Sequence, residues 1–350
     1  MRLFRNCSVT LLLLMLICSC GNEESAVTTI KVDLNNVEKV DLLLQHTAVV
    51  PIQLENVGLI HQLAVKDSIA LLKTDKVLSI NLNTGKQIAE YSRKGRANNE
   101  YLSAWHIGFE DDMVYIYDMN AKKVMYFTSN GELKYNKATP LNTQGKPFQQ
   151  MISYKDNQYI GQRVFGSGDV PELSLYDSTF THIADLGEFV LRSSNSFGSR
   201  FFKDHKGEVL FNRAFLNDIY AISNELVTIR YKIDFGEYSI PDLNEFADEI
   251  EIIQFINNVQ NNEFASMISN IYDSDSYLCF SFLFKINGMN KSQKALCVYN
   301  KENGETKSFI FESGDKAIQH ILIDNEVVQL FQDNEMGDLY VSKIAIEALL

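Results

Sequence analysis

The sequence predicts an all-β protein, a six-bladed β-propeller closed by an N-terminal strand, with one helical insertion between blades four and five. Short β-rich segments recur at a spacing of about 45 residues, which is typical of blades with four strands each. Residues 68–72 align with 113–117, and turn pairs such as Asp111-Asp112 and Lys206-Gly207 separate the segments. A β-sandwich would account for the strands but not for their period.

Six blocks follow one another along the chain, and the last of them is incomplete. They cover residues 59–94, 101–139, 147–190, 196–240, 266–312 and 318–346. The sixth block has three clear strands, and the apolar segment 46–54 precedes the first block. We therefore expect this segment to supply the fourth strand of blade six and to leave no open sheet edge.

The segment of about 242–262 interrupts the β pattern. Leu243, Phe246, Ile250 and Ile253 recur near helical spacing, and acidic residues lie mostly between them. This predicts a helical insertion, which either packs on one face of the ring or covers the mouth of its channel.

The N-terminus combines a basic start with a short apolar run. Arg2 and Arg5 precede the apolar residues 9–17, a run too short to cross about 30 Å of hydrocarbon as a stable helix. The run ends in Cys18-Ser19-Cys20, which resembles the lipobox of bacterial lipoproteins. We therefore predict a lipoprotein signal peptide over residues 1–19, with an ordinary signal peptide or a transmembrane anchor as alternatives.

That resemblance implies cleavage before Cys20 and attachment of lipid to its sulfur, and therefore membrane contact through an N-terminal lipid anchor. Residues 20–45 would then form the acylated cysteine and a polar tether, and residues 46–350 the propeller. Glu23-Glu24 resembles the surface-export signal of Bacteroidetes lipoproteins. It implies an outer membrane lipoprotein at the cell surface, with the periplasmic face as the alternative.

Three further stretches carry a resemblance to a family. They are 91–96 running to Glu100-Tyr101, 217–220, and 233–236 closing on Ile240-Pro241. With them the chain resembles the Bacteroidetes six-bladed β-propeller lipoproteins, relatives of NHL and TolB-like propellers. Ala97-Asn98-Asn99 stands where that family usually has Gly-Pro-Gly. The resemblance implies a fold and a location, and no activity.

Composition and charge exclude several classes of protein. The chain has 350 residues, of which 45% are hydrophobic and 22% charged, which excludes a disordered or collagen-like protein. Its formal net charge is −13, and loss of Arg2 and Arg5 makes it more negative. Such a surface repels phosphate backbones, so we expect no nucleic-acid partner.

Two cysteines remain once Cys7, Cys18 and Cys20 are assigned to the signal and the lipid anchor. Cys279 and Cys297 lie symmetrically about Gly288. A hairpin at this glycine would place them opposite one another, as a disulfide or as two buried small hydrophobic residues.

Three histidines are candidates for a metal site. His61, His106 and His320 each precede a residue of their block's second strand by eight positions, so the pattern predicts one shared position on the inner strands of blades one, two and six. Three imidazoles at one level of the channel would suit a divalent metal with an open fourth position. A one-residue shift would turn a side chain to the other sheet face, leaving a polar channel lined with water.

No standard catalytic motif is present in the sequence. We therefore expect no cofactor beyond that candidate metal, and a noncatalytic binding or scaffolding module for a protein, peptide or glycan. The alternative is a metal-dependent hydrolase or lyase that uses the channel histidines. A sensor that reports a ligand to a membrane partner would have the same sequence features as a binding module.

Overall fold

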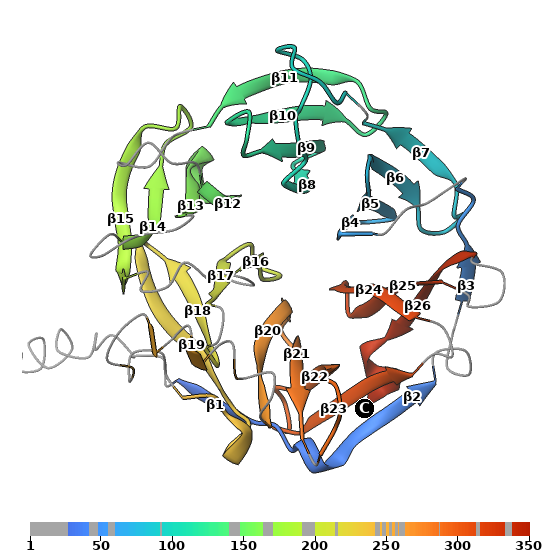
Figure 1. Cartoon of the computed structure of the whole chain (residues 1–350), viewed down its shortest axis with the longest axis vertical. Coiled ribbons are helices and arrows are strands. Elements are labelled where there is room, and N and C mark those ends of the chain that lie inside the picture. Colours follow the sequence, from blue (N-terminus) through green and yellow to red (C-terminus); the bar gives the residue numbers. More distant parts are fainter. Residues whose placement is uncertain are drawn as a thin grey trace, which may run out of the picture.

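The computed structural model is a ring of six sheets around a central channel (Figure 1). It describes residues 27–41, 48–54, 60–91, 93–139, 148–163, 171–190, 200–213, 216–241, 263–286, 288–312, 316–332 and 338–350, and single positions between 246 and 258. The predicted signal peptide and Cys20 lie outside the described residues. The six-bladed all-β fold predicted from the repeat is confirmed.

Each blade has a core of four antiparallel strands, and in blades one to five the first of these four in sequence is innermost (Figure 1). Blade one contains β4 (Gln62–Lys66), β5 (Ile69–Lys73), β6 (Val77–Asn81) and β7 (Gln87–Glu90). Blade two contains β8 (His106–Glu110), β9 (Met113–Asp118), β10 (Lys123–Thr128) and β11 (Leu133–Ala138). Blade three contains β12 (Phe148–Ser153), β13 (Tyr159–Arg163), β14 (Pro171–Tyr176) and β15 (His182–Val190), with the short 3-10 turn η2 (Lys155–Asn157).

The other three blades continue the same order. Blade four contains β16 (Arg200–Lys203), β17 (Val209–Asn212), β18 (Asp218–Ser223) and β19 (Leu226–Asp234), followed by η3 (Gly236–Tyr238). Blade five contains β20 (Phe264–Asp273), β21 (Tyr277–Lys285), β22 (Gln293–Asn300) and β23 (Thr306–Glu312). Blade six contains β24 (Lys316–Ile323), β25 (Glu326–Gln332), β26 (Leu339–Ala345) and, from the N-terminal part of the chain, β3 (Ala48–Pro51); η5 (Ile346–Leu349) follows β26.

The strand β3 links the two ends of the ring. It pairs antiparallel with β26, with Val50 opposite Val341, and lies within the segment 46–54 considered above. Just beyond it, the backbone N–H of Gln53 donates to the carbonyl oxygen of Gly85 in blade one at 2.9 Å. A Cβ on Gly85 would lie 1.8 Å from the oxygen of Pro51, so this close approach requires glycine.

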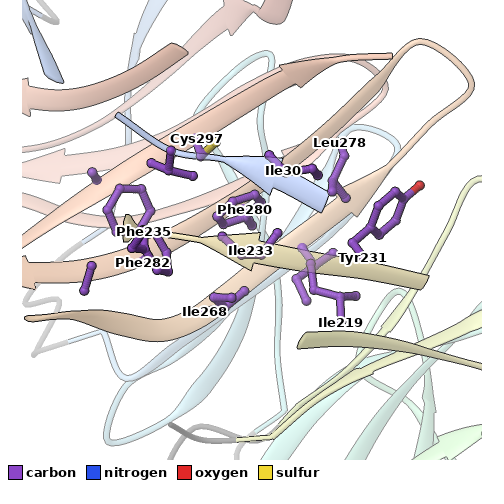
Figure 2. Close-up of a cluster of buried hydrophobic side chains, with 14 of the residues drawn as sticks. Ile30, Ile219, Tyr231, Ile233, Phe235, Ile268, Leu278, Phe280, Phe282 and Cys297 are labelled. Atoms are coloured by element: carbon purple, nitrogen blue, oxygen red, sulfur yellow. The ribbon is translucent and has the colours of Figure 1, made fainter. Parts of the chain in front are cut away.

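Residues 28–41 differ from the expected polar tether. The strand β1 (Thr28–Lys31) adds parallel to β19 of blade four, and β2 (Val37–Asp41) adds parallel to β23 of blade five. Between them runs η1 (Leu34–Asn36). The reason is an alternation of apolar residues, Ile30, Val32 and Leu34, whose side chains are all buried. They join the apolar cluster between blades four and five shown in Figure 2.

The predicted helical insertion at 242–262 lies mostly outside the described residues. Among its described positions, Ile250, Glu251, Gln254, Phe255 and Asn258 have helical backbone. Phe255 stacks on Phe246 with ring centroids 5.1 Å apart. Within the described part of the chain, no helix is long and apolar enough to span a bilayer.

Candidate functional site

The inner strands line a cavity of about 550 Å³ along the channel. Each blade contributes its innermost strand to this lining, and in blade six that strand is β24 (Figure 1). Exposed residues at the ends of these strands, Lys203, His205 and Asp324, line the cavity at one mouth. Deeper in the cavity, amide and imidazole side chains alternate with aliphatic ones.

The polar side chains of the channel connect neighbouring blades. The Gln62 amide donates to the carbonyl of Ile107 and accepts from the N–H of the same residue, both at 3.1 Å. The Gln150 amide lies 3.3 Å from His106 Nε2 and accepts from the backbone N–H of Phe201 at 3.3 Å. Blades one to four are therefore joined in sequence by hydrogen bonds that run around the channel.

His320 makes the corresponding link between blades five and six. Its ring contacts the hydroxyl of Ser281, and its carbonyl oxygen accepts from Asn270 Nδ2 at 3.2 Å. Burial, with the nearby charge of Lys294, lowers the pKa of His320 to about 3. The imidazole is therefore neutral at physiological pH.

The expected metal site of His61, His106 and His320 is not formed, because the three histidines differ in register. Measured from the end of the inner strand, His61 lies five residues before Lys66, His106 four before Glu110, and His320 three before Ile323. The sequence spacing hid one-residue shifts between the hairpins. His106 and His320 line the channel.

His61 lies elsewhere. It lines a separate cavity of about 360 Å³ together with Trp105, its counterpart in blade two. The N–H groups of these two residues donate to the equivalent carbonyls of Lys73 and Tyr117, both at 2.8 Å. Gln62 occupies the position equivalent to His106. Among the described residues, no three His, Cys, Asp or Glu side chains are placed to hold a metal ion.

Of the two alternatives for Cys279 and Cys297, the structure shows two buried free cysteines and no disulfide, again because of a one-residue difference in register. The β21–β22 hairpin forms, but Phe280 is opposite Cys297, and Val298 is opposite Cys279. The two thiols therefore lie on opposite faces of blade five, in different apolar clusters, and both are free. Burial raises the pKa of both thiols, so they behave as small hydrophobic residues.

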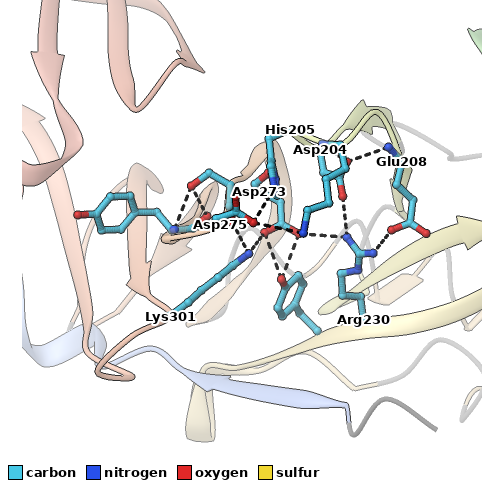
Figure 3. A network of polar contacts seen from close by, with 11 residues as sticks. Asp204, His205, Glu208, Arg230, Asp273, Asp275 and Lys301 are labelled. Carbon is cyan, nitrogen blue, oxygen red and sulfur yellow. Dashed lines mark hydrogen bonds and ion pairs between the residues drawn. The ribbon is translucent and has the colours of Figure 1, made fainter. Parts of the chain in front are cut away.

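A charged network that sequence analysis missed lies between blades four and five (Figure 3). Its centre is Asp273, whose side chain is 2% exposed. The carboxylate pairs with Lys301 and, at 3.2 Å, with Arg230, and it accepts from the Tyr231 hydroxyl at 3.1 Å. The run Asp273-Ser274-Asp275 has the spacing of calcium ligands, but this spacing does not indicate the cations that pair with Asp273. Two protein cations hold its carboxylate instead.

The network extends to the channel mouth. Arg230 also pairs with Asp204 at 3.0 Å and with Glu208, both in the β16–β17 turn. In the same turn the His205 Nε2–H donates to the Asp275 carboxylate at 2.9 Å, and the His205 backbone N–H donates to the carbonyl oxygen of Asp273 at 3.1 Å. Carboxylates and cations of blades four and five thus pair with one another, and these pairs hold the turns that line the channel mouth.

The 91–101 stretch that carried the family resemblance forms a compact loop between blades one and two. Glu100 folds back over Gly95, where a Cβ would lie 1.9 Å from its carboxylate, and it accepts from the N–H of Ala97 at 2.9 Å. Gly95 and Tyr101 are joined by a backbone hydrogen bond of 2.9 Å. The loop's role in the described structure is to shape the connection between the blades.

Comparison with solved structures supports the propeller fold. A structure named as an exported protein of Bacteroides fragilis matches with a TM-score of 0.67 at 14% identity, covering 91% of this chain and 99% of that one. A member of the duf4221 family from Bacteroides vulgatus matches with a TM-score of 0.61 at 10% identity, covering 88% and 98%. At these identities the likeness shows the fold alone.

The sequence comparisons identify a family for this chain but no activity. No curated protein matches the chain. The family model described as a domain of unknown function, DUF4934, matches residues 56–343, which include all six inner strands. The chain therefore belongs to the DUF4934 family.

Proposed function

We propose that this protein is a noncatalytic binding module of the bacterial envelope, and that it binds a protein, peptide or glycan at the channel mouth lined by Lys203, His205 and Asp324. The observation that carries this proposal is the cavity of about 550 Å³ to which all six inner strands contribute. Its volume is in the range of ligand pockets, and its lining mixes apolar side chains with a few polar ones.

The chemistry of the cavity favours binding over catalysis. The channel histidines and amides are engaged in hydrogen bonds between blades, and the His320 imidazole is neutral and buried. A wall held in this way is rigid before a ligand arrives, which reduces the entropy cost of binding.

Site-specific photo-crosslinking in living cells tests the binding face. A photoreactive residue in place of Lys66, which lines the cavity, should form an adduct with the ligand, and mass analysis of the adduct distinguishes protein, peptide and glycan. The matched control is Ile88 of the same blade, which is 36% exposed on the outermost strand β7. Equal labelling from both positions, or none from Lys66, would contradict a binding face at the channel mouth.

We further propose that lipid at Cys20 anchors the module to the outer membrane, facing the cell surface. The support is the lipobox-like Cys18-Ser19-Cys20 and the acidic pair that follows it. Two or more acyl chains give stable anchoring where one gives only reversible binding.

Cys20→Ala in the full chain should abolish incorporation of a labelled fatty acid and leave an uncleaved precursor. The matched control, Cys18→Ala, should be cleaved and lipidated as the natural chain is, because Cys18 precedes the cleavage point. Gel mobility and membrane fractionation measure both results. Normal processing and membrane association of Cys20→Ala would contradict the anchor.

A further inference from the structure

The interface between blades two and three is packed differently from the other five. In the described part of the chain, apolar clusters cross each of the other interfaces. The nearby clusters of blade two and of blade three instead stay separate, and a cavity of about 220 Å³ lies between the blades. Apolar packing therefore does not fill the interface between blades two and three.

Four aromatic rings surround a lysine beside this cavity. Tyr126 and Tyr135 stack with centroids 4.7 Å apart, and Tyr159 and Phe180 lie 4.8 Å apart. Lys137 Nζ, from strand β11, is 5.7 Å from the first two centroids and 5.9 Å from the second two. We call Tyr126, Tyr135, Tyr159 and Phe180 the aromatic cage.

The cage fits a larger cation better than a lysine ammonium. Attraction between a cation and a ring extends to about 6 Å from the centroid, and Lys137 lies near this limit for all four rings. An ammonium that carries methyl groups is wider and would lie closer to all four rings at once. Lys137 is therefore a loosely held occupant.

The cavity is lined by one carboxylate, Glu110, and by one ammonium, Lys203. Glu110 accepts hydrogen bonds from the hydroxyls of Tyr126 at 2.9 Å and Tyr159 at 2.8 Å. Burial and this carboxylate raise the pKa of Tyr159 to about 12, so its phenol stays protonated. The Tyr126 and Tyr159 hydroxyls are directed to the Glu110 carboxylate, and its negative charge adds to the attraction of a cation beside the rings.

The backbone at Phe180 is strained in a way that supports a binding role. Its φ is +63°, a region that bulky residues rarely adopt and that glycine or asparagine would occupy easily. Asp177 fixes the turn by accepting from the N–H groups of Thr179 and Thr181, both at 2.8 Å. An aromatic ring stands at this position despite the strained backbone, and such strain is common at sites that hold a ligand.

We propose that the aromatic cage binds an organic ammonium group of a ligand, such as a methylated or quaternary amine, and that Lys137 occupies the cage when the ligand is absent. The four rings of the cage do not line the channel cavity, although Lys203 lines both the cavity beside the cage and the channel cavity.

Calorimetric titration of the soluble part of the natural chain with choline tests the proposal. The comparison is choline's neutral isostere, in which carbon replaces the ammonium nitrogen. Choline should bind about tenfold more tightly than the isostere, because only the cation gains from the ring faces and from Glu110. Equal affinities for the two compounds, or no saturable binding of choline, would overturn the proposal.

Two variants locate the binding. Lys137→Met should tighten choline binding about tenfold by removing the internal competitor, whereas Lys134→Met on the same strand, exposed and paired with Glu132, should leave it unchanged. Phe180→Asn suits the turn's backbone and should weaken choline binding about tenfold without lowering the melting temperature by more than a few degrees. Equal effects of Lys137→Met and Lys134→Met, or full binding by Phe180→Asn, would place choline elsewhere and overturn the assignment.

Discussion

Asp273→Ala should lower the free energy of unfolding by about 2–3 kcal/mol, because it leaves the partly buried ammonium of Lys301 without a carboxylate partner. The Asp273 side chain is 2% exposed, and it holds Lys301, Arg230 and the Tyr231 hydroxyl at the junction of blades four and five. Arg230 keeps Asp204 and Glu208, but Lys301 loses the only carboxylate within ion-pair distance that the described residues give it. The loss is therefore concentrated at Lys301.

Urea unfolding of the natural chain and the variant measures this effect. The matched control is Asp275→Ala, two residues away, because Asp275 is 77% exposed and pairs with Lys206 and His205 in solvent. The control should change stability by less than about 1 kcal/mol. If the two variants lose the same amount, the network is hydrated and does not hold the blades together.

A second substitution separates the effect of the unpaired Lys301 charge from the effect of the lost contact with Asp273. Combining Asp273→Ala with Lys301→Met should restore part of the lost stability, because the unpaired ammonium is removed and the methionine chain can still pack. Strictly additive losses in the double variant would show that Lys301 does not depend on Asp273.

The repeat made the fold predictable, whereas positions within a blade required a register that the sequence does not determine. Alternating apolar residues allow a hairpin to pair in two registers one residue apart, and the side chains then exchange faces. His61 and Cys279 were both misplaced by one residue in this way. The repeat fixes how many strands exist and in what order, and the turn geometry decides which side chains reach the channel.

The segment 28–41 was predictable in principle. Ile30, Val32 and Leu34 alternate as a strand requires, but they lie outside the repeat, and the segment as a whole is polar enough to predict a tether. The Asp273 network and the aromatic cage were not predictable, because each draws residues from several turns or strands of two blades. No local motif marks residues that meet only after the ring has closed.

Acid should destabilise the natural chain through His320 by about 2–3 kcal/mol between pH 7 and pH 4.5. The folded pKa of about 3 lies below the ordinary histidine value, because burial disfavours the imidazolium. Between these two values the unfolded chain binds a proton that the folded chain does not. Stability is therefore complete above the unfolded pKa and is lost as the pH falls towards the folded one.

His320→Gln isolates this contribution from that of the carboxylates, which also begin to titrate in acid. A glutamine can still hydrogen-bond the Ser281 hydroxyl, so the variant should fold with modestly reduced stability at pH 7 and lose less of it at pH 4.5. His61→Gln changes an exposed histidine and should keep the acid sensitivity of the natural chain. Parallel curves of stability against pH for all three proteins would mean that His320 is protonated within the fold, and that the link between blades five and six opens without cost.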